Sequence, residues 1–320
     1  MSDSVRPKDL RPDPWMTGFA VQYGSGGGFV ADQIAPVFNV AAREFQYPIF
    51  KSEGVASEFE SRVPASGRPN EIRRMKPTYL PGLAHRYALD DSLSDETRLG
   101  SLPQFTNLTS DAGRIKRIVT NLRLDADKRV RDLVVAATHS ATPAVKWDAA
   151  SGVVIEKNFD DARILFELQC GVPATHVILP KRVKNWVKRD ASVRELRKYT
   201  DPTLLIDGDL PPVLWGLKPI VPGAMLNTGN PDVAMTIGLD FIWGAKEAYL
   251  LHVNMDAANS QDVLTAIGQM RWGAYGTPFA GYSWRDAHQS AKKTWYSADV
   301  YQSEKTLCDD AMYKFTAVIS

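Results

Sequence analysis

Histidine is the side chain best suited to acid–base catalysis and metal binding near neutral pH. The sequence contains five, and no two lie three to five positions apart, so no local zinc pair can form. They are His85, His139, His176, His252 and His288. We interpret His176 and His252 as residues at the ends of buried strands rather than as ligands, and long-range clustering stays open.

Paired carboxylates are a second arrangement that could support acid–base chemistry. Adjacent acidic residues occur at Asp90-Asp91, Asp160-Asp161 and Asp309-Asp310. Neighbouring side chains point to opposite faces of a strand, or about 100° apart on a helix, so such pairs do not converge on one substrate. We interpret Asp160 and Asp161 as charges at a helix N-terminus, where they favour the macrodipole.

Nucleotide-binding and hydrolase motifs are absent from the sequence. It has neither a GxxxxGK[ST] loop nor a GxSxG elbow. The glycine-rich run 24–28 follows no expected strand, so we interpret it as a tether rather than a phosphate loop. We therefore predict no catalytic residue, no cofactor-binding residue, no metal ligand and no enzyme activity.

The cysteines and the charge balance narrow the class of protein further. Cys170 and Cys308 fit no metal-binding spacing, so we expect buried free thiols in a reducing cytoplasm. The chain has 38 basic and 37 acidic residues, whereas dedicated nucleic-acid binders carry a clear basic excess. A polyanion could still contact one basic face.

One basic segment stands out from this balance. It comprises Lys181, Arg182, Lys184, Lys188, Arg189, Arg194, Arg197 and Lys198. The segment suits solvated helix faces, and the alternative is ion pairing between subunits or contact with a packaged polyanion. Trp186 lies inside it, and a single aromatic residue at helical spacing is more often part of a core than a stacking platform.

The N-terminal sequence carries charges and prolines where a signal peptide requires an apolar run. No stretch approaches the roughly 20 apolar residues of a membrane helix. We expect the protein to be made and kept in the cytosol, without membrane contact, unless it leaves inside a larger particle.

The first 90 residues hold little core material. Residues 1–28 are rich in proline and glycine, which predicts an extended or mobile arm. The apolar stretch 29–40 is helix-like up to Pro36 and extended beyond it. Residues 50–85 mix charges with glycine and proline between strands expected at 45–50 and 85–89, which predicts a long protruding β-hairpin.

The remainder predicts a mixed α+β architecture. Apolar residues spaced by threes and fours over 108–138 indicate one long amphipathic helix, capped by Ser110 or Asp111, with Arg123 and Asp127 on its polar face. From residue 159, helices expected at 160–169, 181–189 and 192–199 alternate with strands at 177–179, 213–221, 234–238 and 249–253. The strand-like tail, 280–320, should pair with strands that flank the long helix.

The order of these parts resembles the major capsid proteins of tailed bacteriophages, which have the Hong-Kong-97-type fold. The similarity runs from about Phe29 to the end of the chain. The resemblance depends on five segments: FVADQIAPV (29–37), 50–85, 110–138, 159–180 and LWGLKPIV (214–221). They match the family's arm turn, extended loop, spine helix, axial helix and strand, and later axial strand.

This resemblance implies a division of the chain. The N-terminal arm would be 1–44, the extended loop (E-loop) 45–90, and the axial domain 156–274. The peripheral domain would combine 91–155 with 275–320, and its spine helix would span about 110–138. In that fold, axial domains cluster around hexamer and pentamer axes, while the loop and arm lie on neighbouring subunits.

The resemblance also implies the partners. They are further copies of the chain in an icosahedral shell, a portal protein, packaged double-stranded DNA contacted without sequence specificity, and scaffolding or decoration proteins. The protein would be assembled in the host cytoplasm and reside in the virion. A coiled-coil scaffolding region is missing, which implies a separate scaffolding protein or none. Lys51 and Lys76 lie in or near the loop, but no complete reacting trio can be matched, so we predict no covalent cross-link.

Two other interpretations stay open. An encapsulin-type bacterial compartment shares this fold and differs by enclosing an enzyme instead of a genome. A cytosolic α+β enzyme would be a compact monomer or small oligomer, with an apolar pocket and residues 50–85 folded back as a lid.

Overall fold

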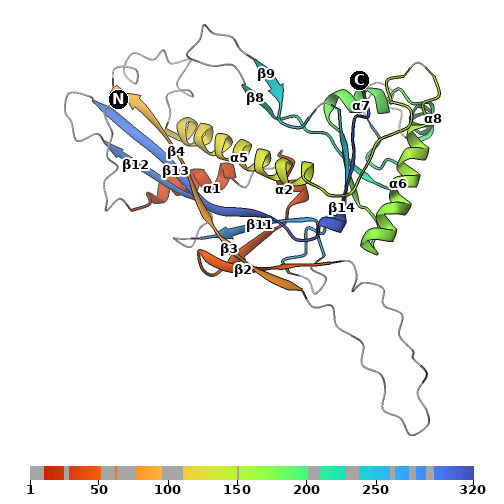
Figure 1. Ribbon diagram of the computed structural model, residues 1–320. Helices are drawn as coiled ribbons and strands as arrows, with labels where there is room; N and C mark the ends of the chain where they lie inside the picture. Colours follow the sequence, from red (N-terminus) through yellow and green to blue (C-terminus); the bar gives the residue numbers. More distant parts are fainter. Residues whose placement is uncertain are drawn as a thin grey trace.

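The structure is a computed structural model. The residues that it describes are 11–24, 29–51, 62, 77–95, 111–149, 151–200, 210–227, 238–244, 246–259, 264–273, 279–285 and 292–320. Two five-stranded sheets, two β-ribbons and a long helix organise these residues (Figure 1).

Strand β13 (Lys293–Thr306) is the axis of the first sheet. Its aromatic and β-branched residues favour a pleated, half-buried surface. One edge pairs antiparallel with β4 (His85–Ser94), and the other pairs in succession with β12 (Phe279–Arg285) and β11 (Ile267–Trp272). The strands expected at 294–297 and 299–301 are therefore parts of one long strand.

The second sheet collects short strands from the C-terminal half in the order β5-β14-β10-β6-β7. Their bounds are Ser140–Ala141, Met312–Phe315, Ala248–Leu251, His176–Ile178 and Lys218–Ile220. All four residues of β10 are buried, as a central strand requires. The chain passes from the first sheet to the second through η3 (Asp309–Ala311).

The tail pairs as its sequence predicts. β13 pairs with β4, the last described strand before the long helix, and β14 pairs in parallel with β5, which follows that helix. The expected strand at 234–238 lies almost entirely outside the described residues. The expected strand at 213–221 is shorter, since a turn at Trp215 and Gly216 precedes β7.

Helix α5 (Asp111–Val135) confirms the long amphipathic helix. Its 25 residues make a rod of about 38 Å at 1.5 Å per residue. The buried stripe packs against β13, β4 and α1, so the helix lies along the first sheet (Figure 1). Ser110, one of the two proposed caps, lies outside the described residues.

Helices α6 (Ile155–Cys170), α7 (Lys181–Val187) and α8 (Ala191–Thr200) accompany the second sheet. Gly171 ends α6 in the left-handed conformation (φ 73°), as its sequence predicts, because glycine adopts it without a Cβ clash. α6 begins earlier than expected. Asp160 and Asp161 therefore lie in its middle, and their interpretation as N-terminal charges is wrong.

The expectation of an extended arm is wrong for Pro14–Gly24, which forms helix α1 on β12 and α5. Pro14 suits a first helical position, and the Asp13 carboxylate accepts the backbone N–H of Trp15 at 2.9 Å. Met16 and Ala20 are buried in a core with Ile115 and Phe279. This part of the segment thus packs on its own chain.

The hairpin strands are real, but their expected pairing is wrong. β2 (Glu44–Ile49) pairs with β3 (Thr78–Leu83), whereas 85–89 belongs to β4 and pairs with β13. Ala84 separates β3 from β4, and its backbone N–H donates a hydrogen bond to the carbonyl of Arg43. Most of the loop between β2 and β3 lies outside the described residues.

Two shorter elements complete the described fold. The stretch 29–40 forms helix α2 (Ala31–Ile34) and strand β1 (Val37–Val40) on either side of Pro36, as predicted, and β1 pairs in parallel with β11. A second ribbon pairs β8 (Met225–Asn227) with β9 (Leu239–Phe241).

Candidate functional site

An apolar ridge on α6 faces solvent. Ile164, Leu165 and Leu168 are 59%, 45% and 78% exposed, although the opposite face of the same helix is fully buried. Leu168 lies three positions from Leu165 and four from Ile164, spacings that make side chains neighbours on a helix, so the three side chains form a continuous strip. We call these residues the α6 ridge. Single exposed leucines are ordinary, but a strip of three on one helix is typical of a contact surface.

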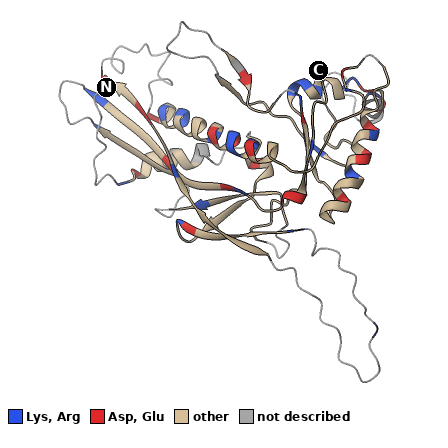
Figure 2. Ribbon diagram, in the orientation of Figure 1, with Lys and Arg blue, Asp and Glu red and all other residues tan. Residues whose placement is uncertain are grey.

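Opposite charges gather on the neighbouring helices (Figure 2). The exposed charged residues of α6 beside the ridge are mainly acidic: Glu156, Asp160, Asp161 and Glu167, with Lys157 among them. The basic segment lies on exposed or half-buried helix faces where its side chains are described, with Lys181 and Arg182 exposed in the first turn of α7. Basic residues in a first turn oppose the macrodipole, so α7 itself does not favour them. The side chains of Arg197 and Lys198 lie outside the described part.

Trp186 combines the two roles considered for it. Its ring is half-buried against the core, and the Arg189 guanidinium lies 4.8 Å from the ring centre. It anchors α7 and supports one exposed cation, which is a packing role.

The β2–β3 ribbon offers a second exposed surface. Tyr79 is 61% exposed and Leu80 38%. An open cleft of about 690 Å³ lies at its base, between residues of both strands, His85 and Lys305. The Lys305 ammonium lies 5.6 Å from the centre of the Tyr47 ring, which links the ribbon to β13.

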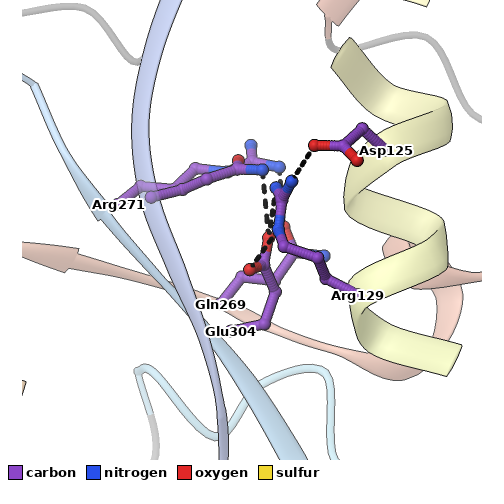
Figure 3. A network of polar contacts seen from close by, with 6 residues as sticks. Asp125, Arg129, Gln269, Arg271 and Glu304 are labelled. Atoms are coloured by element: carbon purple, nitrogen blue, oxygen red, sulfur yellow. Dashed lines mark hydrogen bonds and ion pairs between the residues drawn. The ribbon is translucent and has the colours of Figure 1, made fainter. Parts of the chain in front are cut away.

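A buried polar network ties α5 to the first sheet (Figure 3). The Arg129 guanidinium donates two hydrogen bonds to the Glu304 carboxylate, at 2.8 and 2.9 Å, and also pairs with Asp125. The Tyr87 ring lies beneath the guanidinium, with 3.7 Å between the ring centre and the central guanidinium carbon of Arg129. The desolvation of Glu304 is thus balanced by a bidentate partner.

A second buried contact holds α2 to α5. The fully buried Asp127 carboxylate accepts the backbone N–H of Ala31 at 2.8 Å and the indole N–H of Trp243 at 3.2 Å. Burial raises the pKa of Asp127, and these hydrogen bonds oppose that rise. Arg123, one turn earlier, pairs with Asp32. The expectation that Arg123 and Asp127 face solvent is therefore wrong.

The cavity beside this network is too small for a substrate. It measures about 10 Å³, room for one water, between α2, α5 and the first sheet. Arg123, Arg271 and Asp32 line it, and each has a polar partner nearby. The arrangement positions elements and provides no nucleophile beside a base.

Among the described histidines, His176 and His252 are neighbours at the ends of the paired strands β6 and β10, and the others lie apart from them. His176 begins β6 and His252 follows β10, as predicted; burial, with Lys218 nearby, lowers the pKa of His176 to about 4. His139 bonds Asp310 at 3.0 Å, and Asp91 bonds Arg114 at 2.8 Å. His288 lies outside the described residues. In the described part of the chain, no three histidine, cysteine or acidic side chains are grouped for a metal ion.

Asp299 on β13 gives a test by pH. Burial raises its pKa from 3.8 to about 6, although Arg86 donates to it at 2.6 Å. Because the folded pKa is raised, the folded state gains stability at low pH and loses it as pH rises through about 6. Asparagine does not titrate, so only the wild type loses this stability. Between pH 4 and pH 7, the difference in unfolding free energy between Asp299→Asn and wild type should change by about 2–3 kcal/mol in favour of the variant. Urea unfolding of both proteins at several pH values measures this; an unchanging difference would disprove it.

Sequence reasoning missed the two buried networks. The helix pattern of α5 assigns each of its residues either to the core or to solvent, so it does not predict buried charged residues. Their partners lie on segments that are distant in the sequence. The one available signal was the spacing of Arg123 and Asp127, which places both beside Ala126 and Val130 on the buried stripe.

Comparison with solved structures decides the fold. A phage-related protein from Bordetella bronchiseptica matches with a TM-score of 0.67 at 15% identity, over 97% of this chain and 98% of that one. The capsid of the cyanophage P-SCSP1u matches at 0.59 and 9% identity, over 92% and 89%. A virus-like particle from Pyrococcus furiosus matches at 0.53 and 10% identity, over 94% and 97%. This chain has a capsid fold.

The Hong-Kong-97-type capsid fold predicted from the sequence is therefore confirmed. No family model and no curated protein matches the chain. The capsid fold extends over nearly the whole chain, so α1, the ribbon and both sheets belong to one architecture. Within the described residues, no helix is long and apolar enough to cross a bilayer.

Proposed function

We propose that this protein is the major capsid protein of a tailed bacteriophage, a structural subunit without enzyme activity. Copies assemble into hexamers and pentamers of an icosahedral head that encloses double-stranded DNA. The observation that carries this proposal is the capsid fold shared with phage capsids over more than 90% of the chain. The protein resides in the virion, after assembly in the host cytoplasm.

We assign the parts of the chain as follows. Residues 1–44 are the N-terminal arm and 45–90 the extended loop. Residues 91–155 and 275–320 form the peripheral domain, and 156–274 the axial domain. One apolar cluster lies beside α1 and α5, and the larger cluster around the second sheet also includes residues of α2 and of the C-terminal half of α5. β14 pairs with β10 and β11 pairs with β13, so the two proposed domains share both sheets. The proposed bounds therefore rest on the resemblance to the capsid family.

The exposed helices supply a contact between axial domains. The α6 ridge with its acidic border is complementary to the basic first turn of α7, and each copy carries both surfaces. A contact between two different surfaces repeats head-to-tail and closes into a ring when the rotation permits. The occupant of the α6 ridge is therefore a second copy of this chain.

Other partners follow from the same role. A portal protein fills one vertex, scaffolding or decoration proteins act on the shell, and DNA contacts the inner surface without sequence specificity. The near-neutral total charge suits a wall that holds DNA without binding it tightly.

A protein compartment is the second candidate. The virus-like particle from Pyrococcus furiosus matches at a lower TM-score, 0.53, than the cyanophage capsid at 0.59, so the phage head stays the first candidate. The two functions differ in cargo. Packaged genomic DNA in purified particles supports the phage head, and a packaged enzyme supports the compartment.

Deleting residues 55–74 tests the extended loop. The deletion keeps both strands of the ribbon, β2 and β3, with every residue pair from Glu44–Leu83 to Ile49–Thr78, so the ribbon can still form. We expect a folded protein with wild-type circular dichroism and a melting temperature within a few degrees, but no closed particles by electron microscopy. Normal shells from this variant would refute the loop assignment, and an unfolded variant would show that the loop supports the subunit itself.

A further inference from the structure

Two cysteines that are distant in the sequence meet in the core. Cys170 is the last residue of α6, and Cys308 precedes η3 at the crossover between the two sheets. Both are free and fully buried in the same apolar cluster, and α6 contacts η3. Their side chains hydrogen-bond to each other.

The two thiols influence each other directly. Their mutual hydrogen bond is the largest influence on the pKa of each, and burial raises the pKa of both. Two thiols in contact are the arrangement from which a disulfide forms, because one sulfur can attack the other once the other is oxidised.

We propose that Cys170 and Cys308 form a reversible intramolecular disulfide when the protein meets a peroxide. One of the two thiols gives up its proton and attacks one peroxide oxygen, the O–O bond breaks, and a sulfenic acid forms while the departing hydroxide takes that proton and leaves as water. The other sulfur then attacks the sulfenic sulfur, the S–O bond breaks, and a second water leaves with the proton of the attacking thiol. Two thiols lose two electrons in total and hydrogen peroxide gains them.

The bond would fasten α6 to the crossover. Residues 307–311 carry the chain from β13 in one sheet to β14 in the other, so the bond would tie α6 to a segment that connects the two sheets. The closed loop spans most of the second sheet, and long loops lose the most unfolded-state entropy on cross-linking. Hydrogen peroxide is small and uncharged, so it suits a buried pair better than a bulky disulfide oxidant.

This inference does not rest on the proposed function. A subunit of either a phage head or a compartment would carry the same pair. A phage particle gains an added consequence, because lysis moves it from a reducing cytoplasm into oxidising surroundings.

Thiol counting and peptide mapping test the proposal. After treatment with hydrogen peroxide and removal of the excess, the denatured protein should have lost both titratable thiols. Digestion without reductant should yield one linked peptide that contains both cysteines, lighter than the sum of its parts by two hydrogen atoms. The melting temperature should rise by roughly 5 °C and return to its starting value with dithiothreitol.

Single variants separate this bond from other oxidation. Cys170→Ala and Cys308→Ala should each abolish both the linked peptide and the rise in melting temperature, because neither variant retains a partner thiol. Two thiols that both persist through peroxide treatment, links only between separate chains, or the same stabilisation in Cys170→Ala would each overturn the proposal.

Discussion

Leu168→Lys is expected to stop particle formation while the subunit stays folded. Leu168 is 78% exposed on the α6 ridge, so the free subunit loses almost no packing, and leucine and lysine have similar helix propensities. Its free energy of unfolding should change by less than about 0.5 kcal/mol. In an assembled shell, the lysine would be buried against a neighbour without a partner, at several kcal/mol for each contact.

Because every subunit repeats this contact, the effect on assembly is large. We expect the yield of sedimenting particles to fall at least about 100-fold, the factor that corresponds to roughly 3 kcal/mol. Leu168→Met is the matched control, since it keeps the apolar surface and should assemble normally. Normal particle yield from Leu168→Lys would show that the α6 ridge does not face another copy.

Gly281→Ala is expected to release helix α1 from the first sheet. A Cβ added at Gly281 would lie 2.4 Å from the backbone carbon and oxygen of Met16, and a backbone cannot rotate away as a side chain can. The same glycine accepts the N–H of Asp13 at 2.9 Å, so the clash also strains the bond that anchors α1. We expect a loss of about 2–3 kcal/mol in unfolding free energy and faster proteolysis within residues 14–24.

Gly223→Ala controls for the substitution itself. Nothing lies within 4 Å of a Cβ at that position, so its stability should stay within about 0.5 kcal/mol of wild type. Equal stability of the two alanine variants, or an unchanged rate of cleavage in α1, would mean that α1 does not depend on this close approach.

The local elements were predictable where one residue pattern dominates. The stripe of α5 and the left-handed Gly171 are both set by nearest neighbours along the chain, so the sequence alone located them. Pro36 likewise separates α2 from β1 because proline excludes helix at the residue before it.

Long-range choices were not predictable in the same way. Thr78–Leu83 and His85–Ser94 both have strand-like composition, and the local pattern does not show that the second pairs with the distant β13 while the first pairs with β2. α1 was missed because the prolines before it and the glycines after it suggested an arm, although more than half of its residues are apolar or aromatic. Its docking depends on Gly281, more than 250 positions away. The meeting of Cys170 and Cys308 depends equally on the crossover between sheets.

Electron microscopy of the purified wild-type protein tests self-assembly most directly. Subunits that assemble through contacts with one another should produce closed, hollow particles of uniform diameter. The density of each repeating unit in the particle wall should match the two-sheet subunit. A field of separate globules of about 35 kDa, unchanged at high protein concentration, would contradict the central claim that this chain builds a shell.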